Sequence, residues 1–207
     1  MDAISSTQIA GLILAGGRAV RMGGGDKALI ELMGETLLER AIVRVRPQVG
    51  RLLLNANGDP ARFRRFGLPV LADPVGDHWG PLAGILAGLE HLAAQRQEIS
   101  HLASVPTDSP FLPADLVTRL AAALTHQGAD IAMAESRGRP QPVFALWPVR
   151  LAGDLRGALM SGVRKVEEFA RSYRVARVAW PEEAFFNINS PEDLHLAGQG
   201  LSARRSN

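Results

Sequence analysis

Short apolar runs alternate with amphipathic stretches along most of this 207-residue chain, and this alternation restricts the fold more than any other feature of the sequence. Residues 9–14 are typical of a buried strand, whereas 36–45 has apolar residues at helical spacing. Thr36 and Glu39 form a capping-box pattern at the start of that predicted helix. Strands that alternate with helices usually pair in parallel and connect through right-handed crossovers. The pattern therefore predicts a doubly wound α/β sheet.

The rest of the chain follows the same rule. Further strands are predicted at 52–54, 68–71, 102–105, 130–134, 143–147 and 175–178. Further helices are predicted at 81–91, 113–124, 151–160 and 166–171, and a last one begins at Pro191 after Ser190. We expect one domain over 1–207, with an ordered core over about 9–200 and a frayed tail at 201–207.

The composition argues against several classes of function. Without cysteine, the chain has no disulfide, no thiolate zinc site and no cysteine nucleophile. No apolar run approaches the roughly 20 residues of a membrane-spanning helix, and the N-terminus has no basic leader segment. We therefore expect no membrane partner and a cytoplasmic location. A net charge of +2 and three scattered tryptophans argue against nucleic-acid binding.

A basic, glycine-rich loop follows the first predicted strand, over residues 14–27. Its glycines let the main chain approach a ligand closely, and successive backbone N–H groups in such a loop form an anion-binding nest. Arg21 and Lys27 add full positive charges, so the loop suits a triphosphate. Its glycine spacing matches neither the Walker A loop, G-x-x-x-x-G-K-[ST], nor the dinucleotide-binding fingerprint, G-x-G-x-x-G. A flexible surface loop is the alternative, but α/β sheets bind ligands at this end of their strands.

Two aspartates follow predicted strands. Asp108 comes after 102–105, where a lone carboxylate is well placed to hold Mg²⁺ among waters and phosphate oxygens. A turn, or a helix cap ahead of Pro113, is the alternative. Asp73 comes after 68–71, and a carboxylate there could accept both N1–H and N2–H₂ of guanine, a pair of donors that adenine lacks. The alternative for Asp73 is an Asp-Pro turn.

Two further pairs of polar residues are candidates for binding. Asn187 and Asn189 alternate along an extended segment, which puts both amides on one side, where they could bind a substrate phosphate. In the alternative, they satisfy the turn that Ser190 caps. Arg164 and Lys165 form a small basic cluster that suits an anionic acceptor, and a solvated surface pair is the alternative.

The loop reads L-A-G-G-x-x-x-R-M-G-G-x-D-K and resembles the signature loop of the molybdenum cofactor guanylyltransferases, within the wider sugar-nucleotidyltransferase-like group. The resemblance continues, in the family's order, through Asn55-Ala56-Asn57, Asp73, Gly80-Pro81-Leu82-Ala83-Gly84, Pro106-Thr107-Asp108-Ser109-Pro110-Phe111 and 187–194. Thr107 stands where the family pattern usually has cysteine, while the neighbouring carboxylate is kept. The resemblance implies a mostly parallel, Rossmann-like, three-layer α/β/α fold of the nucleotide-diphospho-sugar transferase type, with helices on both faces.

The same resemblance implies an activity: transfer of GMP from GTP to molybdenum-bearing molybdopterin, with Mg²⁺ as cofactor and release of pyrophosphate. It assigns catalysis to Arg21, Lys27 and Asp108, with the metal on Asp108. The implied GTP-binding residues are Leu14, Ala15, Gly16, Gly17, Lys27, Asn55, Asp73, Gly80 and Asp108. The implied acceptor-side residues are Arg164, Lys165, Asn187 and Asn189.

Other functions remain open on the sequence alone. A cytidylyltransferase acting on the same cofactor, or on another phosphorylated acceptor, would use the same loop, although the G-G-x-D-K ending and Asp73 favour guanine. A non-catalytic nucleotide sensor or carrier would not need both Lys27 and Asp108. The resemblance also leads us to expect an accessory GTP-binding protein and chaperones of molybdoenzymes as partners, and we expect a monomer.

Overall fold

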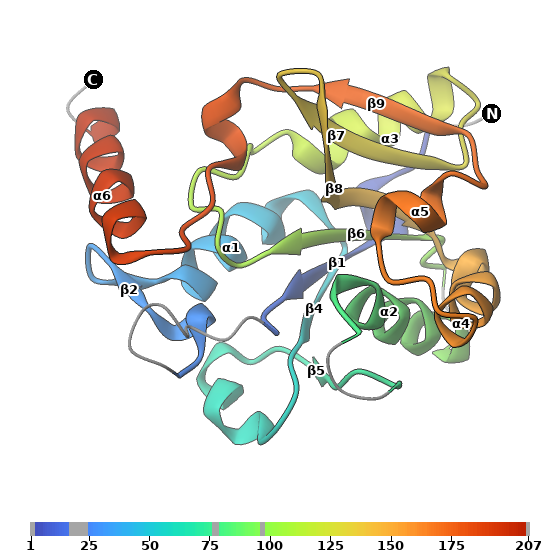
Figure 1. The fold of residues 1–207 in the computed structure, drawn as a ribbon, viewed down its shortest axis with the longest axis horizontal. Helices are drawn as coiled ribbons and strands as arrows, with labels where there is room; N and C mark the ends of the chain where they lie inside the picture. Colours follow the sequence, from blue (N-terminus) through green and yellow to red (C-terminus); the bar gives the residue numbers. More distant parts are fainter. Residues whose placement is uncertain (1–2, 17–24, 76–78, 96–97, 206–207) are drawn as a thin grey trace.

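The computed structural model describes residues 3–16, 25–75, 79–95 and 98–205, with side chains through residue 202. In this part of the chain, one sheet holds seven strands, whose order across the sheet is β5 (Val70–Leu71), β4 (Arg51–Asn55), β1 (Ile9–Leu14), β6 (His101–Pro106), β8 (Arg139–Pro148), β7 (Ile131–Ser136) and β9 (Val175–Ala179). Neighbours pair in parallel except at β8, which runs antiparallel to both β6 and β7. The predicted mostly parallel α/β sheet is confirmed (Figure 1).

The reversed strand β8 departs from the simple alternation of strands and helices. The chain passes from β7 to β8 through Arg137 and Gly138, both with positive φ, at 49° and 68°. A two-residue turn with positive φ at both positions matches the twist of a β-hairpin and joins antiparallel strands. No helix lies between the two strands, so the crossover that parallel pairing requires is missing here.

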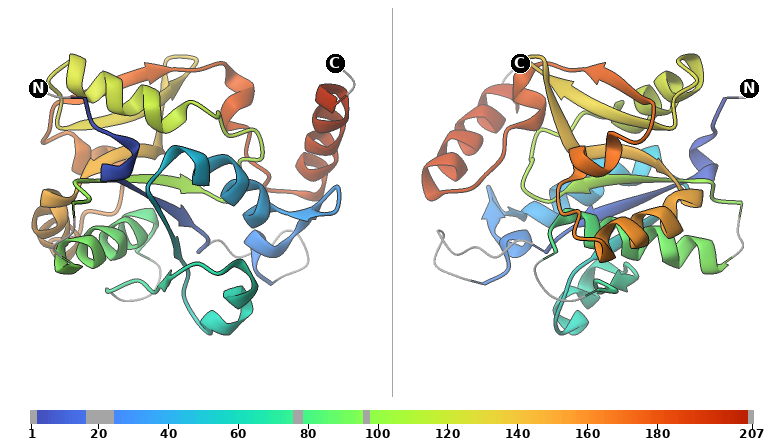
Figure 2. Two further views of the ribbon diagram at one scale, coloured as in Figure 1. Left: turned by 180° about the vertical axis from the view of Figure 1, so that it is seen from behind. Right: turned by 45° about the vertical axis from the view of Figure 1, so that its right-hand side comes forward.

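Helices cover both faces of the sheet and give three layers (Figures 1 and 2). One face carries α1 (Leu37–Val45) and α3 (Leu116–His126), and the other carries α2 (Pro81–Gln95), α4 (Ala152–Met160) and α5 (Val166–Ala170). The side chains of β1 alternate between two apolar cores: Ile9 and Ile13 enter the first, and Leu12 and Leu14 enter the second. Each such burial stabilises the fold by about 1.5–3 kcal/mol before entropy is counted.

The predicted start of α1 is confirmed. The backbone N–H of Glu39 donates to Thr36 Oγ1 at 3.2 Å, and the N–H of Thr36 donates to Glu39 Oε2 at 2.7 Å. These hydrogen bonds form the expected capping box, and the bonds that the Glu39 carboxylate accepts from the Thr36 backbone N–H and hydroxyl lower the pKa of Glu39. The helix α2 begins at Pro81, also as predicted.

Three helices differ from their predicted bounds, and the first of them, α2, continues to Gln95 rather than ending near residue 91. α3 begins at Leu116, because the residues from Pro113 onward form a turn in which the N–H of Leu116 bonds to the Pro113 carbonyl. α6 (Pro191–Arg205) continues through most of the segment that we expected to fray, and Leu201 packs against the apolar cluster that contains Leu32. Among the described residues, no helix is both long enough and apolar enough to cross a bilayer.

A small hairpin that the sequence pattern did not predict lies outside the main sheet. Its strands are β2 (Glu31–Leu32) and β3 (Glu35–Thr36), and its turn residues Met33 and Gly34 have φ of 54° and 82°. Strands of two residues are too short to show a period in the sequence. The hairpin faces α6, and Leu32 of the hairpin shares an apolar cluster with Ala197 and Leu201 of that helix (Figure 1).

Candidate functional site

A cavity of about 1040 Å³ lies at the carboxyl ends of β1, β4 and β6. The register brings these ends together, because Leu14 pairs with Asn55 on one side and with Pro106 on the other. Eight of the predicted nucleotide-site residues line this cavity: Leu14, Ala15, Gly16, Lys27, Asn55, Asp73, Gly80 and Asp108. The other two predicted residues on this side, Gly17 and Arg21, lie outside the described residues.

Lys27 is one of the two cationic residues, with Arg62, among the described residues that line this cavity. Its side chain is only 11% exposed, and its ammonium donates to Asp108 Oδ2 at 2.6 Å and to Asn189 Oδ1 at 2.8 Å. A charge pair that is shielded from water interacts more strongly than one at the surface, and removing either partner leaves the other uncompensated. The structure therefore holds one positive charge in a fixed place beside a carboxylate.

An extended segment that precedes α6 runs beside Asp108. The N–H of Ile188 donates to the Asp108 carbonyl at 2.9 Å, and the Ile188 side chain is fully buried. Asn187 and Asn189 flank it and are exposed on the opposite side, as the alternation predicts. Asn187 Oδ1 accepts from Ser109 Oγ at 2.6 Å. Both amide oxygens thus accept hydrogen bonds from protein groups, the Asn189 oxygen from Lys27 and the Asn187 oxygen from Ser109, although both residues are exposed.

Asp73 is held by two asparagines. Asn55 Nδ2 donates to Asp73 Oδ1 and Asn57 Nδ2 donates to Asp73 Oδ2, each at 2.8 Å. The backbone N–H of Asp73 donates in turn to Asn57 Oδ1 at 2.8 Å. Because a carboxylate oxygen has two acceptor positions, each oxygen keeps one for a ligand. The arrangement presents a fixed double acceptor to the cavity.

The helix α2 approaches the strand ends closely at Gly84. A Cβ at this position would lie 2.7 Å from Asn55 Cγ and 2.7 Å from Leu14 Cδ2, well inside van der Waals contact. Glycine therefore permits the packing that keeps Asn55 in place. Gly80, just before α2, has a φ of 71°, a conformation that favours glycine.

Arg164 and Lys165 lie in the segment between α4 and α5. The guanidinium of Arg164 stacks over the ring of Trp79, with 3.8 Å between Cζ and the ring centroid, and Trp79 lines the cavity. Arg164 therefore lies near the cavity. Lys165 is exposed immediately before α5 and is not among the described residues that line the cavity.

Asp108 is the residue that best fits a divalent cation. Its side chain is 20% exposed and lines the cavity, and within the described residues Lys27 is its hydrogen-bond donor, on Oδ2. The described part of the chain has no group of three or more histidine, cysteine, aspartate or glutamate side chains that could hold a metal. A single carboxylate in the wall of such a cavity suits Mg²⁺, which keeps waters and takes phosphate oxygens.

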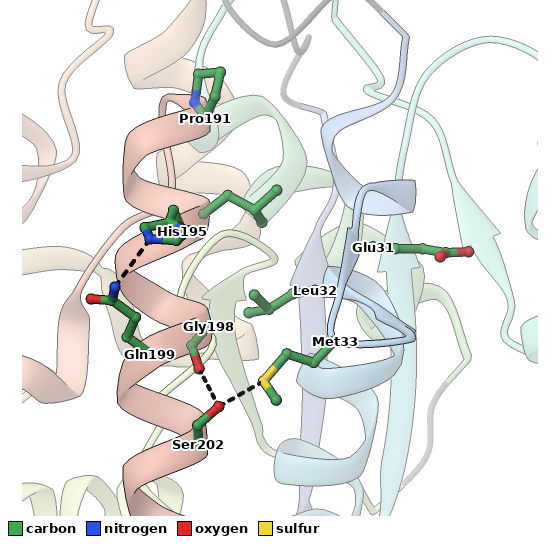
Figure 3. Close-up of a pocket in the computed structure, with 9 residues that line it drawn as sticks. Glu31, Leu32, Met33, Pro191, His195, Gly198, Gln199 and Ser202 are labelled. Atoms are coloured by element: carbon green, nitrogen blue, oxygen red, sulfur yellow. Dashed lines mark hydrogen bonds between the residues drawn. The ribbon is translucent and has the colours of Figure 1, made fainter.

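A second cavity, of about 670 Å³, lies between the β2–β3 hairpin and α6 (Figure 3). Met33 projects toward Ser202, whose hydroxyl donates to the Gly198 carbonyl at 3.0 Å. The described residues that line this cavity include neither lysine nor arginine, and none of the predicted site residues. It therefore does not compete with the first cavity as a phosphate site.

Nine of the described residues that line the first cavity were not among the predicted binding residues: Asp26, Asn57, Gly58, Arg62, Trp79, Pro81, Pro106, Thr107 and Val143. Asn57 carried a usable signal, because it lies two positions after Asn55 in the same motif. Arg62 carried none, because its partners become visible only when the chain is folded.

A cation, a carboxylate and a fixed acceptor pair at the carboxyl ends of parallel strands are typical of α/β proteins that bind phosphorylated ligands at this edge of the sheet. Comparison with known proteins makes the assignment specific. The chain belongs to the MobA-like NTP transferase family, whose model matches residues 11–177.

Individual relatives agree with this assignment. A protein of Rhodopseudomonas palustris (strain BisB5) is 56% identical over 187 residues, covering 88% of this chain and 89% of its own. A protein of Bradyrhizobium sp. (strain ORS 278) is 52% identical over 198 residues, covering 94% and 93%. Both bear the name molybdenum cofactor guanylyltransferase. The predicted family resemblance is confirmed.

Solved structures confirm the fold. The molybdopterin-guanine dinucleotide biosynthesis protein A of Archaeoglobus fulgidus matches with a TM-score of 0.73 at 24% identity, covering 94% of this chain and 99% of its own. A 4-diphosphocytidyl-2C-methyl-D-erythritol synthase of Anaerococcus prevotii matches with the same TM-score at 14% identity, covering 95% and 97%.

Proposed function

We propose that this protein transfers GMP from GTP to molybdenum-bearing molybdopterin, forming molybdopterin guanine dinucleotide and releasing pyrophosphate. One observation carries the proposal: a single cavity presents the Lys27–Asp108 pair on one part of its wall and the Asp73 acceptor pair on another. The first suits phosphate groups, and the second suits a guanine edge. The shared name of the curated relatives supports the choice of acceptor and favours GTP over CTP.

The proposed reaction does not require the protein to transfer a proton. An oxygen of the acceptor's terminal phosphate forms a bond to the α-phosphorus of GTP, and the bond from that phosphorus to the β-phosphate oxygen breaks. The attacking phosphate is already an anion near neutral pH, so a general base is not required. The difficulty is to bring two polyanions together, so positioning and charge neutralisation dominate. The buried ammonium of Lys27 supplies a fixed positive charge for the departing pyrophosphate.

A divalent cation completes the charge balance. Asp108 is the residue that would hold Mg²⁺, which, when bound, draws charge from phosphate oxygens as a Lewis acid. Lys27 hydrogen-bonds to Oδ2, which leaves Oδ1 as the oxygen for the cation. The lysine thereby fixes the orientation of the carboxylate.

Base selection falls to Asp73 in this proposal. The acceptor positions that Asn55 and Asn57 leave open would take N1–H and N2–H₂ of guanine. On the acceptor side, Arg164 supplies a cation near the cavity, and Asn187 and Asn189 present exposed amides beside Asp108. Lys165 would add charge further out.

Calorimetry with GTP, CTP and ATP in the presence of Mg²⁺ tests the nucleotide. We expect GTP to bind with a clear preference, and a preference for CTP would reject the guanylyl assignment. Pyrophosphate release from GTP, measured with and without molybdenum-bearing molybdopterin, then tests the transfer. Binding of GTP without release in the presence of the acceptor would indicate a nucleotide sensor or carrier instead.

A further inference from the structure

Arg62 joins two segments of the cavity wall that are far apart in the sequence. Its Nε donates to Asp26 Oδ2 at 2.5 Å, and its Nη2 donates to the Asn57 carbonyl at 2.5 Å. Its Nη1 donates to the carbonyl of Asp59. Asp26 directly precedes Lys27, whereas Asn57 and Asp59 belong to the turn that follows β4. One guanidinium therefore connects the lysine-bearing segment to this turn.

The surroundings hold this guanidinium in place. Its Cζ lies 4.5 Å from the ring centroid of Phe63, which is fully buried in the core. Gly58 has a φ of 80°, and a Cβ there would lie 3.3 Å from Arg62 Nη1, so glycine leaves room for the arginine. Since Nε, Nη1 and Nη2 each donate to a protein oxygen, these contacts hold the arginine in place in the wall of the cavity.

The connection continues to Asp73. The backbone carbonyl of Asn57 accepts from Arg62. The side-chain amide of Asn57 donates to the Asp73 carboxylate and accepts from the backbone N–H of Asp73. A chain of hydrogen bonds therefore runs from Asp26 through Arg62 and Asn57 to Asp73. We propose that Arg62 is a positioning residue that sets the distance between the phosphate-binding Lys27 and the base-reading Asp73.

This inference rests on the proposed function, because it assigns Asp73 to the base and Lys27 to the phosphates of one nucleotide. The planar fork of arginine binds a carboxylate and two carbonyls at once, and a lysine ammonium does not reproduce this geometry. We therefore expect that Arg62→Lys, although it keeps the charge, will behave like Arg62→Met. If Arg62 contributed only its positive charge, Arg62→Lys would instead bind GTP as the wild type does.

The test compares the affinities for GTP and ITP, because ITP lacks the 2-amino group of guanine. In Arg62→Met we expect the Kd for GTP to rise about tenfold, as for the loss of a charged hydrogen bond, and the Kd for ITP to rise less. The preference for GTP should therefore shrink. Arg64→Met, exposed on the same short helix, is the matched control and should bind both nucleotides as the wild type does.

A double-mutant cycle with Asp26→Asn separates positioning from general loss of stability. If the two residues act through one contact, the double variant should bind GTP within about twofold of Arg62→Met alone. Wild-type affinity and wild-type GTP preference in folded Arg62→Met would overturn the inference. If Arg62→Met does not fold, unchanged GTP affinity in folded Asp26→Asn would overturn it instead. Wild-type protein that does not bind GTP would contradict the proposed function itself.

Discussion

The ammonium of Lys27 lies 2.6 Å from the carboxylate of Asp108, and Asn189 receives a second hydrogen bond from the same ammonium. Replacement of Lys27 by methionine removes the cation and leaves the Asp108 carboxylate without that partner. We expect kcat to fall about a hundredfold, the loss typical of one stabilising donor in an active site. Initial rates of pyrophosphate release measure this, and activity near that of the wild type would exclude Lys27 from charge neutralisation.

Asp108→Asn keeps the size of the side chain and removes its charge. We expect turnover that depends on a divalent cation to be lost, while thermal unfolding shows a folded protein, because an amide oxygen is a weak ligand for Mg²⁺. Rates measured over a titration of Mg²⁺ provide the test. If the variant saturates at the same Mg²⁺ concentration as the wild type, Asp108 does not hold the metal.

Asp73→Asn exchanges an acceptor oxygen for an N–H donor at the position where guanine presents donors. We expect GTP binding to weaken by at least tenfold, because the N–H that the substitution introduces would face an N–H of guanine and leave that donor without an acceptor. ATP binding should change much less, because adenine lacks this pair of donors. Calorimetry with both nucleotides measures the difference. Equal weakening for GTP and ATP would show that Asp73 does not read the base.

Gly84→Ala places a methyl group against Asn55 and Leu14. Overpacking of this kind typically costs about 1–3 kcal/mol of unfolding free energy. Because Asn55 holds Asp73, we also expect weaker GTP binding. Gly157→Ala, at a helical position where a Cβ meets no atom within 4 Å, is the control and should not lose stability or affinity. Urea unfolding and calorimetry of both variants check this prediction.

The stability of the protein should fall on mild acidification because of His101. Burial, and secondarily the charge of Arg150, lower the pKa of His101 below its ordinary value of 6.5. The unfolded chain then takes up a proton near pH 6.5 that the folded protein accepts only at lower pH, so the contribution of His101 is complete above pH 6.5 and is lost as the pH falls below it. His101→Gln should therefore narrow the difference in unfolding free energy between pH 5 and pH 8, which urea unfolding at the two pH values measures.

Much of the fold was predictable because its signals are local. The capping box at Thr36 and the helix start at Pro81 depend on neighbours within one turn, and both are confirmed. The turn that precedes α3 was missed because a proline that begins a helix and a proline that begins a turn share the same local preference. The β2–β3 hairpin was missed because its strands are too short to show a pattern.

The features of the site also divide into those that the local sequence predicts and those that depend on the folded chain. Strand ends and glycine-rich segments are visible in the sequence, and the residues predicted from them line one cavity wherever the structure describes that wall. Which side chains contact one another is a property of the folded chain. The hydrogen bonds from Lys27 to Asp108 and from Arg62 to Asp26 join residues 81 and 36 positions apart, and no spacing rule predicts either.

The hydrogen bond between Lys27 and Asn189 spans 162 positions of the chain, and its acceptor lies beyond the region that matches the family model. Because β9 ends at Ala179, all seven strands of the main sheet are synthesised before this asparagine. The complete environment of the lysine can therefore form only after the strands that carry the rest of the cavity have been made.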